Sequence, residues 1–413
     1  MTSERGVVAT RGAYVLGLFA LANLLNYASR NVPFAVYDDL RARYLVDSAQ
    51  LGWLGTAFML PHALATIPVG WLGDRTDRRR LVALGALLWT GGSVLGALAP
   101  TFELVVASRF LVGLGTATVV PVANAVLGQL YRGPGKASAL AIFNLGLFLG
   151  GVVGFGVGAG LGFPVSWLVI AAPGLVVALG LLALDLGPAA ATGDRGTWRQ
   201  LVRDARLVVR VPTVRRMMLA CTVLAFAAGG YQAWLLDFLQ NDKGMSERAA
   251  TSLLAVCIVG GLAGVVAGGR VADRLRRRVA WGRPGAIALG MAATVPCATL
   301  CVLAPAGPLL WAGSLATMFF ISWYHGPMAA TVDDVAPPRQ AASAQAVVIA
   351  CMHLLGTAPS SRVIGELYKQ WGAREAMLVA TAAVALGAAL TARAFSSYAA
   401  DARGAGEGQA HGL

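Results

Sequence analysis

The chain of 413 residues is 57% hydrophobic and only 13% charged, and its formal net charge is +13. A soluble domain needs about 25% charged residues to cover its surface, so this composition excludes a soluble globular fold. Apolar runs of about 20 residues, the length of a transmembrane helix, recur along the whole chain. The sequence therefore predicts an all-α polytopic membrane protein. Its basic residues lie in short loops between these runs, which indicates membrane topology and not nucleic-acid binding.

Twelve apolar runs are predicted to form transmembrane helices. They lie roughly at residues 13–36, 50–72, 80–99, 103–128, 137–162, 165–186, 213–239, 247–269, 281–303, 308–331, 340–365 and 374–396. We expect two six-helix bundles, residues 1–186 and 213–396, joined by a basic linker at 187–212. The tail at 397–413 is rich in Ala, Gly and polar residues and is expected to be disordered.

The linker holds apolar residues at every third or fourth position from Trp198 to Val209, between arginines. This spacing favours an amphipathic helix lying on the inner leaflet, with a solvated basic linker as the alternative. Placing both termini in the cytoplasm puts most of the 33 Lys and Arg residues on the cytoplasmic side, as topology rules require. The Arg-rich and Ala/Gly-rich composition favours a bacterial inner (plasma) membrane.

All five cysteines lie inside apolar runs, without a His or carboxylate cluster nearby. The sequence therefore predicts no metal site, no cofactor and no disulfide framework. The fifth run carries glycine at every fourth position, at Gly146, Gly150, Gly154 and Gly158. This pattern predicts a face of close helix packing.

A charged motif, Gly-x-x-x-Asp-Arg-x-x-Arg-Arg, follows the second run at 70–79 and returns after the eighth run at 269–278. A repeat separated by about half the chain indicates two similar halves, a common plan of secondary transporters. Each motif Asp ends a helix and can accept hydrogen bonds from the positive N-terminus of a facing helix. The predicted cytoplasmic gate consists of Gly70, Asp74, Arg75, Arg78, Arg79, Gly269, Asp273, Arg274 and Arg277.

Twelve helices in two halves with this repeated motif resemble the major facilitator superfamily. Three stretches also resemble the Spinster family: 23–30 (NLLNYASR), 70–75 (GWLGDR) and 109–117 (RFLVGLGTA). The resemblance implies a monomeric transporter of lysolipid-like or sphingoid amphiphiles. It further implies that the motif clusters latch the cytoplasmic side in the outward-open state.

Two positions depart from the Spinster pattern. The acid expected in the first run is Ser29, and the acid expected in the fourth run is Thr116. By the resemblance these acids would carry proton coupling, so the coupling ion is left open. The accompanying Arg30 and Arg109 remain.

Charged residues inside a membrane are costly and are functional by default. Arg30 and Arg109 offer planar bidentate contacts that suit phosphate or carboxylate, and we expect them to line one anionic headgroup site. The alternative is a structural role, with each guanidinium bonded to helix carbonyls or a partner acid. Aromatic side chains with polar tips in the seventh and tenth runs suit a cavity for an amphiphile, or else a membrane-interface belt. The predicted substrate-binding residues are Arg30, Arg109, Asn26, Tyr27, Ser29, Thr116, Tyr231, Trp234 and Tyr324.

Three histidines lie in apolar runs: His62, His325 and His353. Imidazole changes charge near neutral pH and is able to replace a carboxylate as proton carrier. These three are the coupling candidates, with structural hydrogen bonding as the alternative.

The sequence thus predicts a secondary or facilitative transporter of an amphiphilic anion or zwitterion, in contact with membrane lipids. The alternatives are a small organic anion symporter and a multidrug exporter. An exporter of cations would need an acidic side chain in its cavity, and the first and fourth runs lack the acids that would supply it. No paired carboxylates or nucleophile motif indicate an enzyme, so no catalytic residue is predicted. A non-transporting sensor could dispense with the repeated gate motif, which both halves keep.

Overall fold

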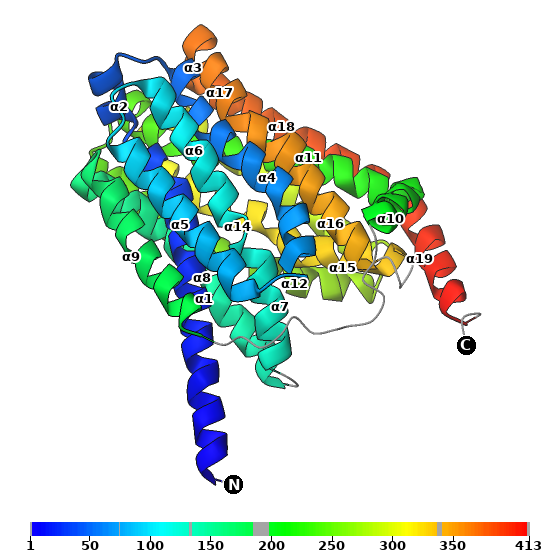
Figure 1. Ribbon diagram of the computed structural model, residues 1–413. Helices are drawn as coiled ribbons and strands as arrows, with labels where there is room; N and C mark the ends of the chain where they lie inside the picture. The colour runs from blue at the N-terminus through cyan, green and yellow to red at the C-terminus, as the bar shows by residue number, and fades with distance from the viewer. Residues whose placement is uncertain (1, 74, 132–133, 185–197, 337–340, 411–413) are drawn as a thin grey trace. The chain divides into compact units, whose positions relative to one another are not determined.

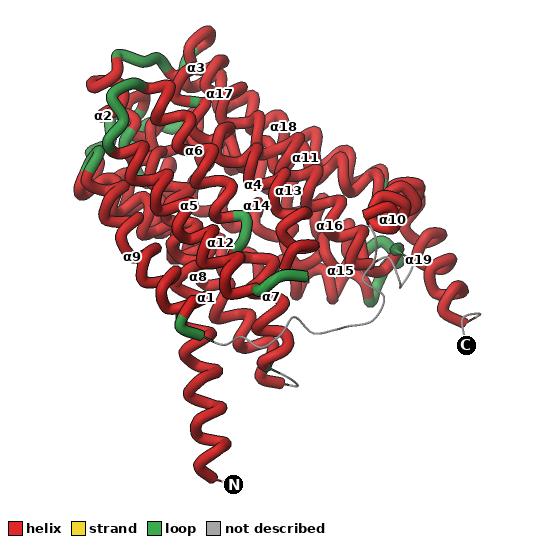
Figure 2. The backbone as a smooth tube through the Cα atoms, in the orientation of Figure 1, coloured by secondary structure: helices red, strands yellow, loops and turns green. Residues whose placement is uncertain are grey.

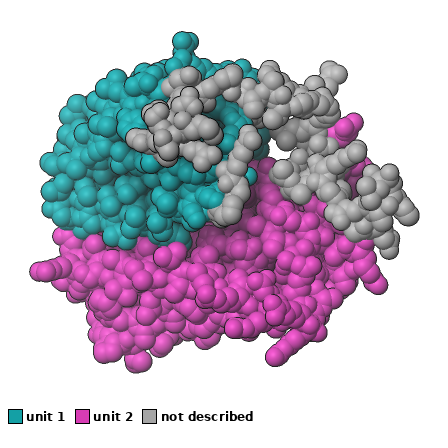
Figure 3. Space-filling model, turned by 90° about the horizontal axis from the view of Figure 1, so that it is seen from below, with its two compact units in different colours: residues 1–192 teal, residues 193–413 magenta. Residues whose placement is uncertain are grey.

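The structure is a computed structural model that describes residues 2–73, 75–131, 134–184, 198–336 and 341–410. Every regular element in these ranges is a helix (Figure 1, Figure 2). The all-α fold predicted from composition is confirmed. The chain divides into two compact units, Met1–Thr192 and Gly193–Leu413 (Figure 3).

The first unit carries the first six predicted runs. Its described helices are α1 (Thr2–Ala35), α2 (Tyr37–Tyr44), α3 (Ser48–Leu51), α4 (Trp53–Gly73), α5 (Arg78–Ala97), α6 (Phe102–Thr116), α7 (Val119–Leu130), α8 (Pro134–Leu161) and α9 (Val165–Leu182). One predicted run, 103–128, is divided between α6 and α7. Pro121 lies in the first turn of α7, where its missing N–H does not weaken the helix.

The second unit carries the linker helix, the other six runs and the tail. Its described helical elements are α10 (Trp198–Arg210), α11 (Pro212–Asp237), η1 (Phe238–Asp242), α12 (Glu247–Arg276), α13 (Gly282–Leu303), α14 (Pro308–Ile321), η2 (Ser322–Tyr324), α15 (His325–Val335), α16 (Ala341–Cys351), η4 (Met352–Thr357), α17 (Ala358–Trp371), α18 (Ala373–Arg393) and α19 (Phe395–Ala410). A 3₁₀ turn at η2 interrupts the tenth run, and a π-helical segment at η4 interrupts the eleventh.

Ten helical segments among the described residues are long and apolar enough to cross a membrane. The two remaining predicted runs are also helical: 50–72 corresponds to α3 and α4, and 308–331 to α14, η2 and α15. The described residues of each of the twelve predicted runs therefore lie largely on helices, which is consistent with a twelve-helix transporter.

The glycine face predicted on the fifth run packs against α1. A Cβ atom added at Gly150 would lie 2.4 Å from the Leu24 carbonyl oxygen, and one at Gly154 would lie 2.7 Å from the Ala28 carbonyl oxygen. Because these distances are far below van der Waals contact, the two helices approach as closely as they do only with glycine there. The predicted packing face is confirmed.

The linker helix α10 packs against α11 and α16. Val208 on this helix is fully buried, whereas Arg203, Arg206 and Arg210 are exposed. This is the two-sided pattern that its spacing predicts. Its position on the inner leaflet remains a prediction, and residues 187–197 of the linker lie outside the described residues.

Residues 397–410 of the tail lie in helix α19, whereas composition predicts disorder for them, and residues 411–413 lie outside the described residues. Tyr398 on α19 is 3% exposed, and its hydroxyl donates to the Asp334 carboxylate of α15. The Thr213 amide donates to Asp401 Oδ2 over 2.9 Å, and its hydroxyl is 2.7 Å from that of Ser397. Burial and the Asp334 carboxylate both raise the pKa of the Tyr398 phenol. These specific tertiary contacts order the helix, and average composition does not register them.

Candidate functional site

The charge of Arg109 on α6 is buried in the interior of the first unit, with 1% of the residue exposed. Its Nη2 donates to the Ser29 carbonyl oxygen of α1 over 2.8 Å. The guanidinium carbon lies 5.1 Å from the ring centroid of Phe58 and 5.4 Å from that of Trp167. Arg109 Nε and Ser29 Oγ are buried without a hydrogen-bond partner. Within the described part of the chain no carboxylate pairs with Arg109, so its positive charge is offset only by a carbonyl and two ring faces.

The predicted residues of α1 lie along the same region of the first unit. Asn26 and Ser29 are buried, whereas Tyr27 and Arg30 are half-buried. The structure therefore brings Ser29 and Arg109 together, and it leaves Arg30 as the more accessible of the two guanidinium groups.

His62 of α4 contacts the second position at which an expected acid is missing. Its Nδ1 lies 3.1 Å from Thr116 Oγ1, and its ring stacks on Phe58 with centroids 5.6 Å apart. The approach of α6 to α4 requires Gly113, because a Cβ there would lie 2.2 Å from the Phe58 carbonyl oxygen. His62, Phe58 and Arg109 thus form one contiguous cluster.

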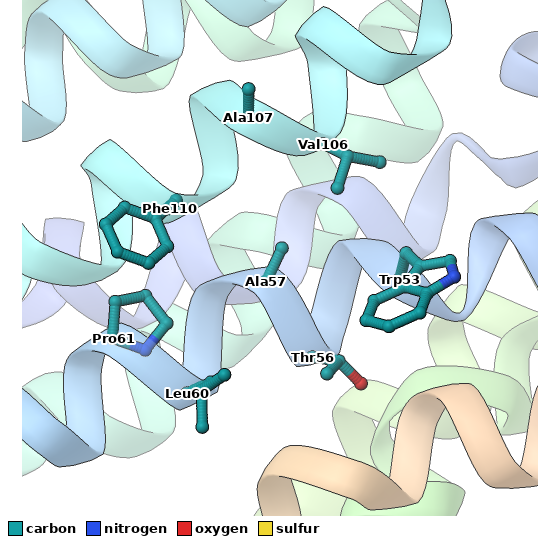
Figure 4. Close-up of a pocket in the computed structure, with 8 residues that line it drawn as sticks. All are labelled: Trp53, Thr56, Ala57, Leu60, Pro61, Val106, Ala107 and Phe110. Carbon is teal, nitrogen blue, oxygen red and sulfur yellow. The ribbon is translucent and has the colours of Figure 1, made fainter.

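An apolar groove of about 440 Å³ lies between α4 and α6 (Figure 4). Trp53, Leu60 and Pro61 of α4 line it together with Val106 and Phe110 of α6. The side chains of Trp53, Leu60 and Phe110 are well exposed. Such a surface binds hydrocarbon and gives polar groups no partner.

Two of the three predicted substrate residues of the second unit, Tyr231 and Trp234, form hydrogen bonds within that unit. The Tyr231 hydroxyl is 2.5 Å from Thr381 Oγ1, and Trp234 Nε1 donates to the Ser361 carbonyl oxygen over 2.9 Å. Both residues are buried, and the Trp234 ring stacks on Tyr368. Tyr231 and Trp234 therefore tie α11 to α18 and α17 in this structure.

The 3₁₀ turn η2 brings Tyr324 and His325 side by side, with ring centroids 4.1 Å apart. Tyr324 is half-buried and His325 is exposed. His353 lies in the π-helical segment η4 and is half-buried. π-Helical segments are frequent at functional sites, so His353 remains a candidate.

The first copy of the predicted gate is held by hydrogen bonds within the first unit. Arg78 Nε donates to the Gly73 carbonyl oxygen, and its Nη1 donates to Gln129 Oε1 of α7 over 2.8 Å. Arg79 Nε donates to Asp77 Oδ2 over 2.8 Å. Partial desolvation acts to raise the pKa of the Asp77 carboxyl, but the hydrogen bonds and charge of Arg79 outweigh it and hold that pKa below its usual range.

Of the other three predicted members of this copy, Gly70 lies near the end of α4 and Arg75 lies in the turn that follows the helix. Arg75 stacks on Trp71, with its guanidinium carbon 4.1 Å from the ring centroid. Gly70 lies beside Pro121, since a Cβ there would be 3.8 Å from the proline Cβ. Asp74 lies outside the described residues, so its predicted role as a helix-terminal acceptor stays a prediction.

The second copy of the gate is more open to solvent. Asp273, Arg274 and Arg277 are exposed, and Gly269 has no heavy atom within 4 Å of an added Cβ. The neighbouring Arg276, which is not among the predicted gate residues, forms an ion pair: its Nη1 lies 3.7 Å from Asp334 Oδ1.

Asp334, which the sequence analysis missed, is the acidic centre of this end of the second unit. It pairs with Arg283 of α13 and with Arg276, and it accepts the Tyr398 hydroxyl. The sequence carried one signal for this residue. Asp333 and Asp334 are adjacent acids just after the tenth apolar run, whereas the other segments on the predicted cytoplasmic side are mostly basic.

Comparison with known proteins places this architecture. Residues 19–358 match the family model described as Major Facilitator Superfamily. Protein spinster of Drosophila melanogaster is 26% identical over 383 residues, covering 86% of this chain, and the chain spans 61% of the fly protein. The sphingosine-1-phosphate transporter SPNS2 of Xenopus tropicalis is 27% identical over 380 residues, covering 84% of this chain and 72% of its own length.

Solved structures agree with this placement. A bacterial homologue of the human lysosomal transporter Spinster, in an inward-facing and unoccupied conformation, superposes with a TM-score of 0.79 at 20% identity, covering 96% of this chain and 98% of its own. The nucleoside transporter NupG gives a TM-score of 0.77 at 13% identity, covering 93% of this chain and 99% of its own. At these identities the likeness shows the fold alone. The resemblance to Spinster proteins read from the sequence motifs is confirmed, and the chain belongs to the Major Facilitator Superfamily.

Proposed function

We propose that the protein is a secondary or facilitative transporter that moves an amphiphilic anion or zwitterion, such as a sphingoid phosphate or a lysophospholipid, by alternating access. The observation that carries the proposal is the Arg109 guanidinium, buried in a membrane helix without a carboxylate partner among the described residues. An uncompensated cation gives its surroundings a positive potential, which attracts anions and repels cations. This favours an anionic ligand over the cations of a multidrug exporter.

Relatives support the chemical class of this ligand. The matched Xenopus protein is named as a transporter of sphingosine 1-phosphate, a phosphate headgroup on a long hydrocarbon chain. A phosphate suits the half-buried Arg30, which directly follows the Ser29 carbonyl that Arg109 binds. The apolar groove between α4 and α6 suits a hydrocarbon chain.

The remaining parts of the proposal rest on the composition, charge distribution and spacing of the sequence, and on superfamily membership. Both termini face the cytoplasm of a bacterial inner membrane, the protein works as a monomer without catalytic residues, and α10 lies on the inner leaflet. The two motif copies act as the cytoplasmic gate, and the Asp334 contacts belong to the second copy.

Sphingosine 1-phosphate is expected to stabilise the purified protein against thermal unfolding, and Arg30→Ala is expected to lose this effect. A ligand that binds only the folded state raises the unfolding free energy by about 2.7 kcal/mol at 100 times its Kd. The measurement is a thermal shift with sphingosine 1-phosphate, a lysophospholipid and a small dicarboxylate, using exposed Arg248→Ala as the control variant. Stabilisation by the dicarboxylate alone would contradict a lipid substrate and would favour the alternative, a symporter of small organic anions.

Filling the groove is expected to lower transport of long-chain ligands selectively. Ala107→Trp adds an indole to a groove of about 440 Å³, so the hydrocarbon chain loses apolar contact worth about 0.8 kcal/mol per excluded methylene. Uptake is measured for phosphates with short and long chains, with Leu179→Trp on an exposed position of α9 as control. An equal loss of uptake for short-chain and long-chain phosphates would show that the groove does not bind the hydrocarbon chain.

A further inference from the structure

The proposed function leaves open what drives transport, and the hydrogen bonds around His62 bear on this question. Thr116 Oγ1 lies 2.9 Å from the Val112 carbonyl oxygen and 3.1 Å from that of Gly113. A hydroxyl has one hydrogen, and a carbonyl oxygen only accepts, so the Thr116 hydrogen is committed to its own helix. Towards His62, Thr116 Oγ1 is therefore an acceptor.

This commitment fixes the tautomer of His62. Its Nδ1 lies 3.1 Å from Thr116 Oγ1 and must carry the hydrogen of that bond. The neutral ring then holds its basic lone pair on Nε2. A proton that binds the neutral ring therefore adds at Nε2, and a proton given back leaves from Nε2, while the bond to Thr116 stays in place in both charge states.

Few charged groups lie on the described first-unit helices that pack against the helix of His62. Helix α4 packs against α1, α3, α6 and α7. Among described side chains, α3 and α7 hold no charged or titratable group, α6 holds Glu103 and Arg109, and α1 holds Tyr14, Tyr27 and Arg30. Glu103 is thirteen positions before Thr116, about 20 Å along the helix, so Arg109, which lies against the same Phe58 ring as His62, is the nearer charge of α6.

One ring connects His62 with the buried cation. Phe58 stacks on the His62 ring at an interplanar angle of 18°, and the Arg109 guanidinium lies against the same phenyl group. Protonation of His62 would thus place two cations on one aromatic ring. An anion bound in this region offsets the repulsion between them, so anion binding and proton binding favour each other, and by linkage the effect is reciprocal.

We propose that His62 is the proton-binding residue of this transporter, positioned by Thr116 and coupled through the Phe58–Arg109 pair to the anionic substrate. The proposal rests on the proposed function for the identity of the anion, but not for the titrating atom. The proposal predicts symport, in which the anion and the proton move in the same direction, because the binding of each one favours the binding of the other.

The first test observes the proton directly. Full-length protein labelled with ¹⁵N-histidine contains four histidines, and the signal lost in His62→Gln identifies His62. We expect Nδ1 to stay protonated at every pH, and the proton that His62 gains as the pH falls to appear at Nε2. Thr116→Val is expected to disturb this tautomer, and Thr116→Ser to restore it. A constant Nε2 signal as the pH falls, or a titration unaffected by Thr116→Val, would overturn the assignment.

The second test observes the coupling, with sphingosine 1-phosphate as the probe. In wild type its apparent affinity is expected to be about tenfold higher at about pH 5.5 than at about pH 8, and in His62→Gln to be equal at both. If His325→Gln or His353→Gln removes the pH dependence instead, the assignment to His62 is wrong. If sphingosine 1-phosphate binds no variant at all, the proposed substrate class fails, and the titration of Nε2 decides alone whether His62 binds the proton.

Discussion

Replacing Arg109 with methionine is expected to reduce transport to about 1% of wild type or less, while the folded protein keeps or gains stability. Truncating a buried, hydrogen-bonded charge at a recognition site costs about 2–5 kcal/mol of binding energy. Replacing a buried ion with an apolar side chain of similar volume is, in contrast, often neutral or stabilising by about 1–4 kcal/mol. Arg109 is 1% exposed and has no carboxylate partner in the described chain, so its removal relieves a desolvation cost.

This combination separates the two interpretations of Arg109. If the arginine serves only to bond α1 through the Ser29 carbonyl, Arg109→Met lowers the unfolding temperature and leaves the transport of surviving protein intact. Uptake into proteoliposomes and thermal unfolding are measured on the same preparations. Arg109→Lys is the companion variant: it keeps the charge but loses the planar group that lies against Phe58 and Trp167, so we expect partial transport.

Gly150→Val is expected to destabilise the folded protein and to lower its yield. The added Cβ would lie 2.4 Å from the Leu24 carbonyl oxygen and 2.7 Å from the Tyr27 Cβ, and backbone atoms have no room to yield. Overpacking of this kind costs about 1–3 kcal/mol and sometimes more, and here it separates α1 from α8 along a face that four glycines form. The measurement is the yield of monodisperse protein after extraction, together with its unfolding temperature.

Gly156→Val is the matched control on the same helix. A Cβ at Gly156 has no heavy atom within 4 Å, and the position is exposed. Both variants replace helical glycine with the same β-branched residue, so their intrinsic helix propensities are equal. If Gly156→Val is lost to the same extent as Gly150→Val, close packing of α8 on α1 is not the reason for the glycine pattern.

The architecture could be predicted because a helix that crosses a bilayer needs particular residues at neighbouring or regularly spaced positions. Three such patterns can be recognised in the sequence: the apolar runs, the glycine spacing from Gly146 to Gly158 and the repeated charged motif. Such requirements involve neighbouring positions or a fixed helical period. For this reason the described residues of all twelve runs lie largely on helices.

The details of the site depend on contacts between distant positions, which spacing does not encode. Arg109 and Ser29 are 80 positions apart, and His62 and Thr116 are 54 apart, so their meeting emerges only from the packing of α1, α4 and α6. The same applies to α19, whose Tyr398 reaches Asp334 across 64 positions. Composition predicted disorder for the tail because it averages over the few side chains that anchor it.

The central claim, recognition of an anionic headgroup beside a hydrocarbon chain, is tested most directly by competing two ligands that differ only in the phosphate. Uptake of sphingosine 1-phosphate into proteoliposomes containing the purified protein is measured in the presence of excess sphingosine or excess unlabelled sphingosine 1-phosphate. The account predicts saturable uptake that unlabelled sphingosine 1-phosphate inhibits and sphingosine does not. The positive potential around Arg109 attracts the phosphate group, whereas sphingosine has the same amine without the phosphate and is a cation. Equal competition by sphingosine, or uptake of sphingosine itself, would contradict an anionic site.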